Sequence, residues 1–154
     1  MTGAPRHAAE PAEVSAADVA RVLALGEERF VSLTTFRKSG VRVSTPVWIV
    51  RDGDRLIVTT PAESGKVKRL RNSDRVELRP CSRSGQVDES REPVPARAVI
   101  RDDSAEVSRG GELFLRKYTL EYRVFMVIER IAARRRKRRV MLHVHAVPGS
   151  APPA

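Results

Sequence analysis

The chain has few cysteines and few aromatic residues. Cys81 is its one cysteine, which rules out a disulfide within the chain and fits a reducing compartment. Aromatic residues make up 5% of the chain, too few to favour the base-stacking surface of a nucleic-acid-binding barrel. The longest strictly apolar run, Val124–Ile128, is far shorter than the roughly 18 residues of a membrane-spanning helix, and the start shows no secretion-signal pattern. We therefore expect a cytoplasmic protein.

Acidic residues are missing from one strongly basic stretch. Residues 130–139 hold seven cations and no acid, whereas the rest of the chain contributes only +3 to the net charge of +10. Such a run is most often a solvated helix end. The alternative is contact of Arg134–Arg139 with an anionic surface, whether nucleic acid, a membrane surface or a polyanionic ligand. The charge excess is therefore local and does not by itself indicate a nucleic-acid-binding protein.

The length and composition predict one globular domain. The 154 residues suffice for a single core, and 41% hydrophobic and 31% charged residues are typical of a globular protein. Residues 1–13 contain prolines and several alanines and are expected to form a flexible arm, and residues 148–154 a flexible tail. The folded domain is thus predicted to span residues 14–147.

Short strand patterns separated by turn signals dominate the chain. We predict strands at 29–36, 41–50, 55–60, 75–81, 94–101 and 140–147, and helices at about 15–26, 65–71 and 110–135. Pro46 cannot donate to a ladder, so it should mark a bulge or a sheet edge, where a ligand can approach the backbone. The pattern predicts a mainly β fold, a six-stranded antiparallel barrel with an N-terminal helix and a long helix before the last strand.

The segment 55–71, RLIVTTPAESGKVKRLR, is the strongest candidate for a binding site. A β-branched strand ends in Thr59 and Thr60, and a short loop leads into a basic helix at Ser64-Gly65-Lys66. The start of a helix provides unpaired N–H donors and partial positive charge, which suit a phosphate group. Hydroxyls, N–H groups and cations are therefore expected to meet in one small volume, and we predict a site for a phosphorylated cofactor.

The order of motifs resembles a known superfamily. The segments that carry the likeness are Phe30–Phe36, Thr45–Trp48, Val58–Thr60, Ser64–Lys66 and Leu70–Arg71. Together they resemble the split β-barrel flavin and deazaflavin oxidoreductases, the superfamily of pyridoxamine-phosphate oxidase, and are most similar to the branch that uses the deazaflavin coenzyme F420. The likeness covers about residues 15–147. It implies a homodimer in which the cofactor lies at the subunit interface and a second copy completes the site.

The resemblance also implies roles for individual residues. Thr59 and Thr60 would hydrogen-bond the phosphate or ribityl oxygens, and Ser64 and Lys66 would hold the phosphate. The backbone of the strand Thr45, Pro46, Val47 and Trp48 would lie along the ring of the cofactor. Hydride transfer needs positioning and electrostatics more than a protein acid or base, and the sequence shows no nucleophile–histidine–acid arrangement, so no catalytic side chain is predicted.

Two positions depart from the pattern of the FMN-dependent oxidases. Those enzymes have an arginine where this chain has Ser44, and another where it has Gly65. Bidentate arginine contacts are among the strongest that a phosphate can receive, so FMN should bind more weakly here. F420, whose phosphodiester and polyglutamate tail could spread its charge over Lys68, Arg69 and Arg71, is the favoured cofactor, with FMN as the alternative.

Several residues admit more than one interpretation. Trp48 is expected either to contact a planar cofactor or to pack in the core, and Tyr118 and Tyr122 to belong to the apolar stripe of the long helix. His143 and His145 share a strand face but lack the accompanying ligands of a metal site, and Cys81 is expected to be buried rather than reactive. Besides the oxidoreductase, a cofactor carrier without turnover and a basic nucleic-acid-binding barrel remain as alternative functions.

Overall fold

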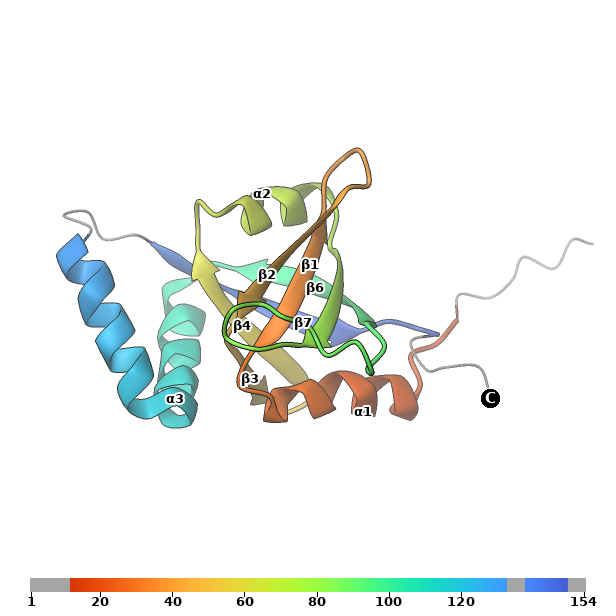
Figure 1. The fold of residues 1–154 in the computed structure, drawn as a ribbon, viewed down its shortest axis with the longest axis horizontal. Helices are drawn as coiled ribbons and strands as arrows, with labels where there is room; N and C mark the ends of the chain where they lie inside the picture. Colours follow the sequence, from red (N-terminus) through yellow and green to blue (C-terminus); the bar gives the residue numbers. More distant parts are fainter. Residues whose placement is uncertain (1–11, 133–137, 150–154) are drawn as a thin grey trace, which may run out of the picture.

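A single antiparallel sheet, strongly curved, forms the body of the protein (Figure 1). The computed structural model describes residues 12–132 and 138–149, with the backbone alone for 120–132. Seven strands follow the order β2-β1-β5-β6-β7-β4-β3. Their bounds are β1 Val31–Phe36, β2 Arg42–Val47, β3 Ile49–Asp52, β4 Arg55–Pro61, β5 Arg75–Pro80, β6 Val94–Arg101 and β7 Arg139–Ala146. The predicted mainly β, antiparallel split barrel is confirmed.

The number of strands differs from the prediction because one expected strand is divided. The segment predicted as a single strand at 41–50 breaks at Trp48 into β2 and β3, so the sheet has seven strands instead of six. β2 pairs with β1, whereas β3 pairs with β4. The chain therefore passes from one edge of the sheet to the other within one residue. The two edges meet there without a ladder between them, which is the split in the barrel, and Pro46 lies on an edge strand as expected.

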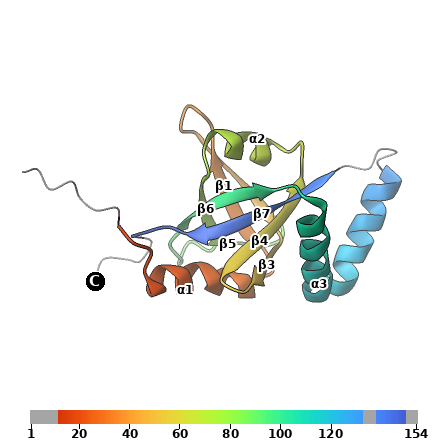
Figure 2. The same ribbon diagram turned by 180° about the vertical axis from the view of Figure 1, so that it is seen from behind.

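Two helices close the ends of the barrel (Figures 1 and 2). α1, Ala16–Ala24, continues into the 3-10 turn Leu25–Glu27 and buries Val22 and Leu25 against the core. α1 begins close to the predicted residue 15, and Ser15 is its N-cap, with its Oγ accepting a hydrogen bond from the Asp18 N–H at 3.1 Å. At the other end α2, Gly65–Asn72, buries Val67 and Leu70. The core thus lies inside the curved sheet between α1 and α2.

A third helix covers the outside of the sheet. α3, Ser104–Ala132, begins earlier than predicted and contains a break at Thr119, where φ is 43° and ψ is −107°. The break divides α3 into two arms that lie side by side and run in opposite directions (Figures 1 and 2). The first arm buries Phe114 and Tyr118 in a second apolar cluster together with Ile57 and Met141.

An ion-pair network joins this arm to the hairpin between β3 and β4. Arg109 donates to both carboxylate oxygens of Asp52, at 2.9 and 2.6 Å. These hydrogen bonds, with the nearby Arg55, lower the pKa of Asp52 to about 2. Asp52 therefore stays ionised at neutral pH and holds α3 at this edge of the sheet.

Several segments considered in the sequence lie outside the residues that the structure describes. The expected arm at 1–13 and tail at 148–154 lie mostly there, as do Arg134–Lys137 of the basic run and the side chain of Tyr122. Among the described residues, no helix combines the length and apolar character needed to cross a bilayer.

Candidate functional site

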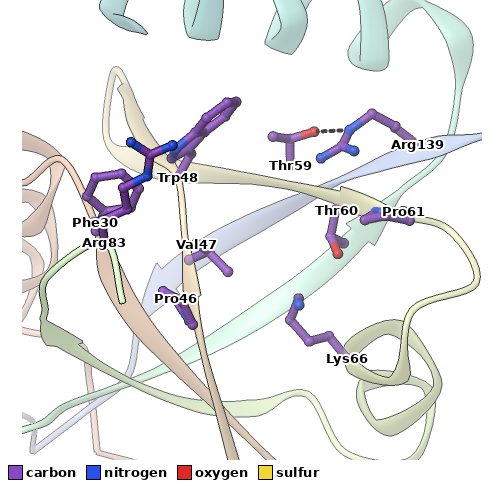
Figure 3. A pocket seen from close by; sticks show the side chains of 10 residues that line it. All are labelled: Phe30, Pro46, Val47, Trp48, Thr59, Thr60, Pro61, Lys66, Arg83 and Arg139. Atoms are coloured by element: carbon purple, nitrogen blue, oxygen red, sulfur yellow. Dashed lines mark hydrogen bonds between the residues drawn. The ribbon is translucent and has the colours of Figure 1, made fainter. Parts of the chain in front are cut away.

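A pocket of about 330 Å³ opens at the split of the barrel (Figure 3). Its walls come from segments far apart in the sequence: the junction of β2 and β3, the end of β4, the first turn of α2 and the first residue of β7. Six residues predicted for the cofactor site line it, namely Pro46, Val47, Trp48, Thr59, Thr60 and Lys66. The fold thus brings the predicted phosphate corner and the predicted ring-contacting strand together around one space.

The polar corner of the pocket is built by the pairing of β4 with β7. Pro61 pairs with Arg139 in this ladder, so the first residue of β7 lies beside the end of β4. The Arg139 Nε donates to the Thr59 Oγ1 at 3.0 Å, and the Thr60 Oγ1 donates to the Ser64 Oγ at 3.2 Å. These hydrogen bonds hold a guanidinium and two threonines at the strand end (Figure 3).

Lys66 lies in this corner among other cations. Its side chain is half-buried, and it makes no ion pair with any residue that the structure describes. Burial lowers the pKa of Lys66, and the positive charges of Arg69 and Arg139 lower it further. A bound anion would reverse this effect, because it would compensate three cations that now repel one another. The electrostatics of the corner therefore favour a ligand with more than one negative charge.

Arg69 occupies the space that Gly65 leaves open. The Arg69 Nε donates to the buried Thr35 Oγ1 at 2.7 Å, which fixes the guanidinium over the first turn of α2. A Cβ on Gly65 would lie only 2.7 Å from a terminal nitrogen of Arg69. Because Gly65 and Arg69 are four residues apart on a helix, they share a face. Gly65 thus makes room for a guanidinium that arrives from within the same helix.

α2 begins at Gly65, where the sequence predicted a helix start. The Ser64 Oγ accepts from the Val67 N–H at 3.4 Å and so caps α2. The first N–H groups of a helix have no partner within it, and α2 carries no acidic residue in its first turn. Partial positive charge at this end therefore adds to that of Lys66, Arg69 and Arg139.

Trp48 provides an apolar surface on the opposite wall of the pocket. Trp48 stacks on Tyr118, with ring centroids 5.1 Å apart and planes at 21°. The Tyr118 hydroxyl donates to the Arg29 carbonyl at 2.7 Å and accepts from the Ile49 N–H at 3.0 Å. Trp48 packs against the apolar cluster, as one of its two interpretations predicted, and it also lines the pocket, so its contact with a planar cofactor stays a prediction.

Five predicted site residues do not line the pocket. Thr45 alternates with Pro46 along β2, and its Oγ1 is enclosed without a hydrogen-bond partner among the described residues. Lys68 is exposed on another face of α2, and Ser64, Gly65 and Arg69 surround the helix start just outside the lining. A ligand therefore reaches Ser64, Gly65, Lys68 and Arg69 only if it extends beyond the pocket or contacts its rim.

Four further lining residues were not predicted, namely Phe30, Pro61, Arg83 and Arg139. Arg139 belongs to the basic run, and its place at the start of the last predicted strand was the one available signal. The preceding residue of that run, Arg138, pairs with Asp102 at 3.3 Å. Two of the arginines considered for an anionic surface are thus engaged within the protein.

The cysteine and the two histidines considered in the sequence lie outside the pocket lining. Cys81 is half-buried in a bridge to Val87, and burial raises the pKa of its thiol. The rings of His143 and His145 meet edge to face at 6.5 Å, and the His143 Nε2 lies 3.1 Å from a Glu106 carboxylate oxygen. In the part of the chain that the structure describes, no group of three or more potential ligands could hold a metal ion.

Comparison with solved structures places this architecture among known folds. The chain has the split-barrel fold of the pyridoxamine 5'-phosphate oxidase type. The conserved hypothetical protein Rv2991 from Mycobacterium tuberculosis superposes with a TM-score of 0.59 at 17% identity, covering 94% of this chain and 95% of that one. A Listeria innocua protein assigned as a pyridoxamine 5'-phosphate oxidase gives 0.51 at 14% identity, covering 85% and 93%.

A third split barrel is an F420 reductase, which superposes with a TM-score of 0.50 at 16% identity and covers 80% of this chain and 91% of its own. No protein-family model and no curated protein sequence matches the chain. Identities this low establish the split-barrel fold. They leave cofactor and activity to be argued from the pocket itself.

Proposed function

We propose that this split barrel binds the deazaflavin coenzyme F420 at the described pocket and acts as an oxidoreductase on a small organic substrate. The observation that carries the proposal is the corner where Lys66, Arg69 and Arg139 gather beside two threonine hydroxyls, next to an apolar wall. A cofactor with a planar ring and a phosphate matches these two features, because the ring suits the apolar wall and the phosphate suits the cationic corner. The fold, which an F420 reductase also has, supports the proposal.

The residues of the pocket fit such a cofactor. Lys66 and Arg139 would bind phosphate oxygens, with Thr59 and Thr60 as additional hydrogen-bond partners. Val47 and Trp48 would support the ring and exclude water from one of its faces. When bound, the cofactor would supply the centre that donates or accepts a hydride. The protein's part is to bind and orient, with Tyr118 holding Trp48 in place.

The two departures from the FMN-dependent pattern favour the longer cofactor. The Ser44 Oγ lies 2.7 Å from the Thr34 Oγ1 and serves the pairing of β1 with β2, so this position offers no cation. At Gly65 the missing arginine is replaced by Arg69, whose guanidinium comes from one turn further along α2. This cation lies outside the pocket lining, near the exposed Lys68. Such a distribution suits a charge that continues beyond the phosphate.

The proposal includes a homodimer. The cavity of about 330 Å³ lies at the low end of the roughly 300–1,000 Å³ typical of small-molecule sites. It is bordered by β2, an edge strand of the sheet. A second copy placed against this edge would enclose the part of the cofactor that one copy leaves exposed.

Parallel titrations with F420, FMN and FAD test the proposal. The absorbance spectrum of the purified protein identifies any retained cofactor, and fluorescence titration of F420 should then give micromolar or tighter binding. Lys66→Ala should weaken F420 by about tenfold or more, because a charge-assisted hydrogen bond contributes about 1.5–3 kcal/mol. Lys38→Ala, at an exposed turn lysine, removes the same charge and should leave the affinity unchanged. Absent binding, or equal effects of the two variants, would contradict the proposal.

A cofactor carrier without turnover is the second candidate, alongside an FMN-binding oxidoreductase. The ten residues that line the pocket include no carboxylate, imidazole or thiol, so among the usual proton-transfer groups the described site offers only the amine of Lys66, which is assigned to the phosphate. Steady oxidation of reduced F420 with a panel of enones, quinones and tetrapyrroles would eliminate the carrier. A nucleic-acid-binding role predicts a complex at low ionic strength in a salt-titrated gel shift, and its absence would exclude that role.

A further inference from the structure

The end of the pocket opposite Lys66 contains a cation with no assigned role. Arg83 lines the pocket beside Phe30 and Trp48, away from Lys66 and Arg139 (Figure 3). Its side chain is exposed, and it makes no hydrogen bond or ion pair with any residue that the structure describes. The phosphate corner already has its own cations, so Arg83 is available to a different negatively charged group.

The turn that carries Arg83 is held in place by hydrogen bonds. The Ser82 N–H donates to the Gln86 carbonyl at 2.9 Å, and the Gly85 N–H donates to the Ser82 carbonyl at 2.9 Å. Gly85 has a φ of +90° and lies against Pro46 of the pocket wall, where an added Cβ would meet the proline ring at 3.4 Å. The turn is therefore a built part of the pocket.

The surroundings of Arg83 select the kind of ligand. Phe30 and Trp48 offer flat apolar surface, while a guanidinium binds a carboxylate through two parallel hydrogen bonds. No acidic residue is among those that line the pocket, so none competes for the guanidinium there. A ligand that satisfies both features has a flat apolar body and a carboxylate at one end.

We propose that Arg83 is a specificity-determining residue, and that the substrate which enters at this end of the pocket is a flat organic anion such as an aromatic carboxylate. That the bound anion is a substrate depends on the proposed oxidoreductase function, whereas the preference for binding an anion does not. The site lies beside the wall assigned to the cofactor ring, where a reacting molecule has to be placed. Arg83 would orient it by its carboxylate and leave the apolar part facing the ring.

Trp48 supplies a site-specific signal for the test, because it is the one tryptophan of the chain. We would follow its single indole N–H resonance in 15N-labelled protein during titration with trans-cinnamate and, separately, with trans-cinnamamide, which has nearly the same shape and no charge. Cinnamate should bind about fivefold more tightly than the amide, the size of effect expected for a partly exposed carboxylate–arginine pair. Arg83→Gln should abolish this preference, and Arg83→Lys should retain part of it.

Two matched variants show whether the preference belongs to Arg83 and not to positive charge elsewhere. Arg97→Gln removes the same charge from an exposed strand position outside the pocket and should preserve the preference. Lys38→Ala removes a charge from an exposed turn outside the pocket and should also preserve it. A preference that survives Arg83→Gln, or is lost in either control, would overturn the proposal, as would the absence of any cinnamate-induced shift.

Titration of F420 into the Arg83→Gln variant separates this proposal from the proposed function. F420 affinity should change by less than twofold. A loss as large as that caused by Lys66→Ala would assign Arg83 to the cofactor and refute a substrate role. If F420 fails to bind the unaltered protein while the cinnamate preference still depends on Arg83, the proposed function fails and the anion preference stands.

Discussion

Replacing Gly65 by alanine should separate ligand affinity from stability. The new Cβ would lie 2.7 Å from a terminal nitrogen of Arg69, whereas ordinary contacts begin at 3.4 Å. The guanidinium is the flexible end of a side chain, so we expect it to move by roughly 1 Å and weaken its 2.7 Å hydrogen bond to Thr35. The backbone of α2 should stay in place.

The opposing contributions to stability nearly cancel. Loss of the Thr35 hydrogen bond should cost about 1 kcal/mol. Exchange of glycine for alanine in a helix recovers up to about 1 kcal/mol, and less in the first turn. The free energy of unfolding should therefore change by less than about 1 kcal/mol. Affinity for a phosphorylated cofactor should fall by about tenfold, because a charge-assisted contact contributes about 1.5–3 kcal/mol and would be lost or misplaced.

The assay combines urea denaturation with cofactor titration. Gly65→Ala, Arg69→Ala and the double variant form a cycle, and the double variant should bind no more weakly than Arg69→Ala alone, because Gly65 acts only through Arg69. Unchanged affinity in Gly65→Ala, or additive losses in the double variant, would show that Gly65 does not make room for a ligand-binding arginine.

Three further predictions concern the frame of the pocket. Lys117→Met should lower the free energy of unfolding by about 2–4 kcal/mol. The Lys117 ammonium donates to the carbonyls of Gly26, Glu28 and Ile49 at 2.5–2.7 Å, and the substitution would leave these carbonyls without this partner. Urea denaturation checks this, with Lys38→Met as the exposed control. Tyr118→Phe should cost about 1–2 kcal/mol and alter the emission of Trp48, which stacks on that ring. Burial lowers the pKa of His143, so the unfolded state binds more protons and stability should fall as pH drops below about 6.5. Melting temperature plotted against pH from 8 to 5 should therefore have a smaller slope in His143→Gln than in the unaltered protein. An unchanged slope would contradict this.

Local sequence patterns were sufficient to predict which residues lie together on one side of the pocket. Thr59, Thr60 and Lys66 lie within eight consecutive residues of a strand, loop and helix, so their proximity follows from short-range geometry. The cap at Ser64 has the same origin, because a hydroxyl at the first helical boundary bonds to the N–H groups that follow it. Gly65 stands where the FMN-dependent oxidases have an arginine, and this difference could be read from the sequence. The position of the Arg69 guanidinium over Gly65 could not, because it depends on a hydrogen bond to Thr35, far away in the sequence.

The division of the predicted strand 41–50 could not be read from its residues. The apolar pattern continues through Trp48, and a strand pattern contains no information about which neighbour each part pairs with. The break arises because β2 joins β1 while β3 joins β4 at the other edge. Tyr118 contributes to it from α3, since its hydroxyl bonds to the Ile49 N–H at 3.0 Å, just after the break.

The fold class, the proximity of Thr59, Thr60 and Lys66 and the start of α2 follow from the amino-acid sequence, because they depend on periodicity and on residues close along the chain. The position of Arg139 beside Lys66 required the folded structure, since the β4–β7 ladder pairs Thr60 with Val140, which lie far apart in the sequence. The folded structure also placed Arg83 at the other end of the pocket through the packing of its turn on Pro46. Pairing between distant strands sets these positions, and no local rule encodes it.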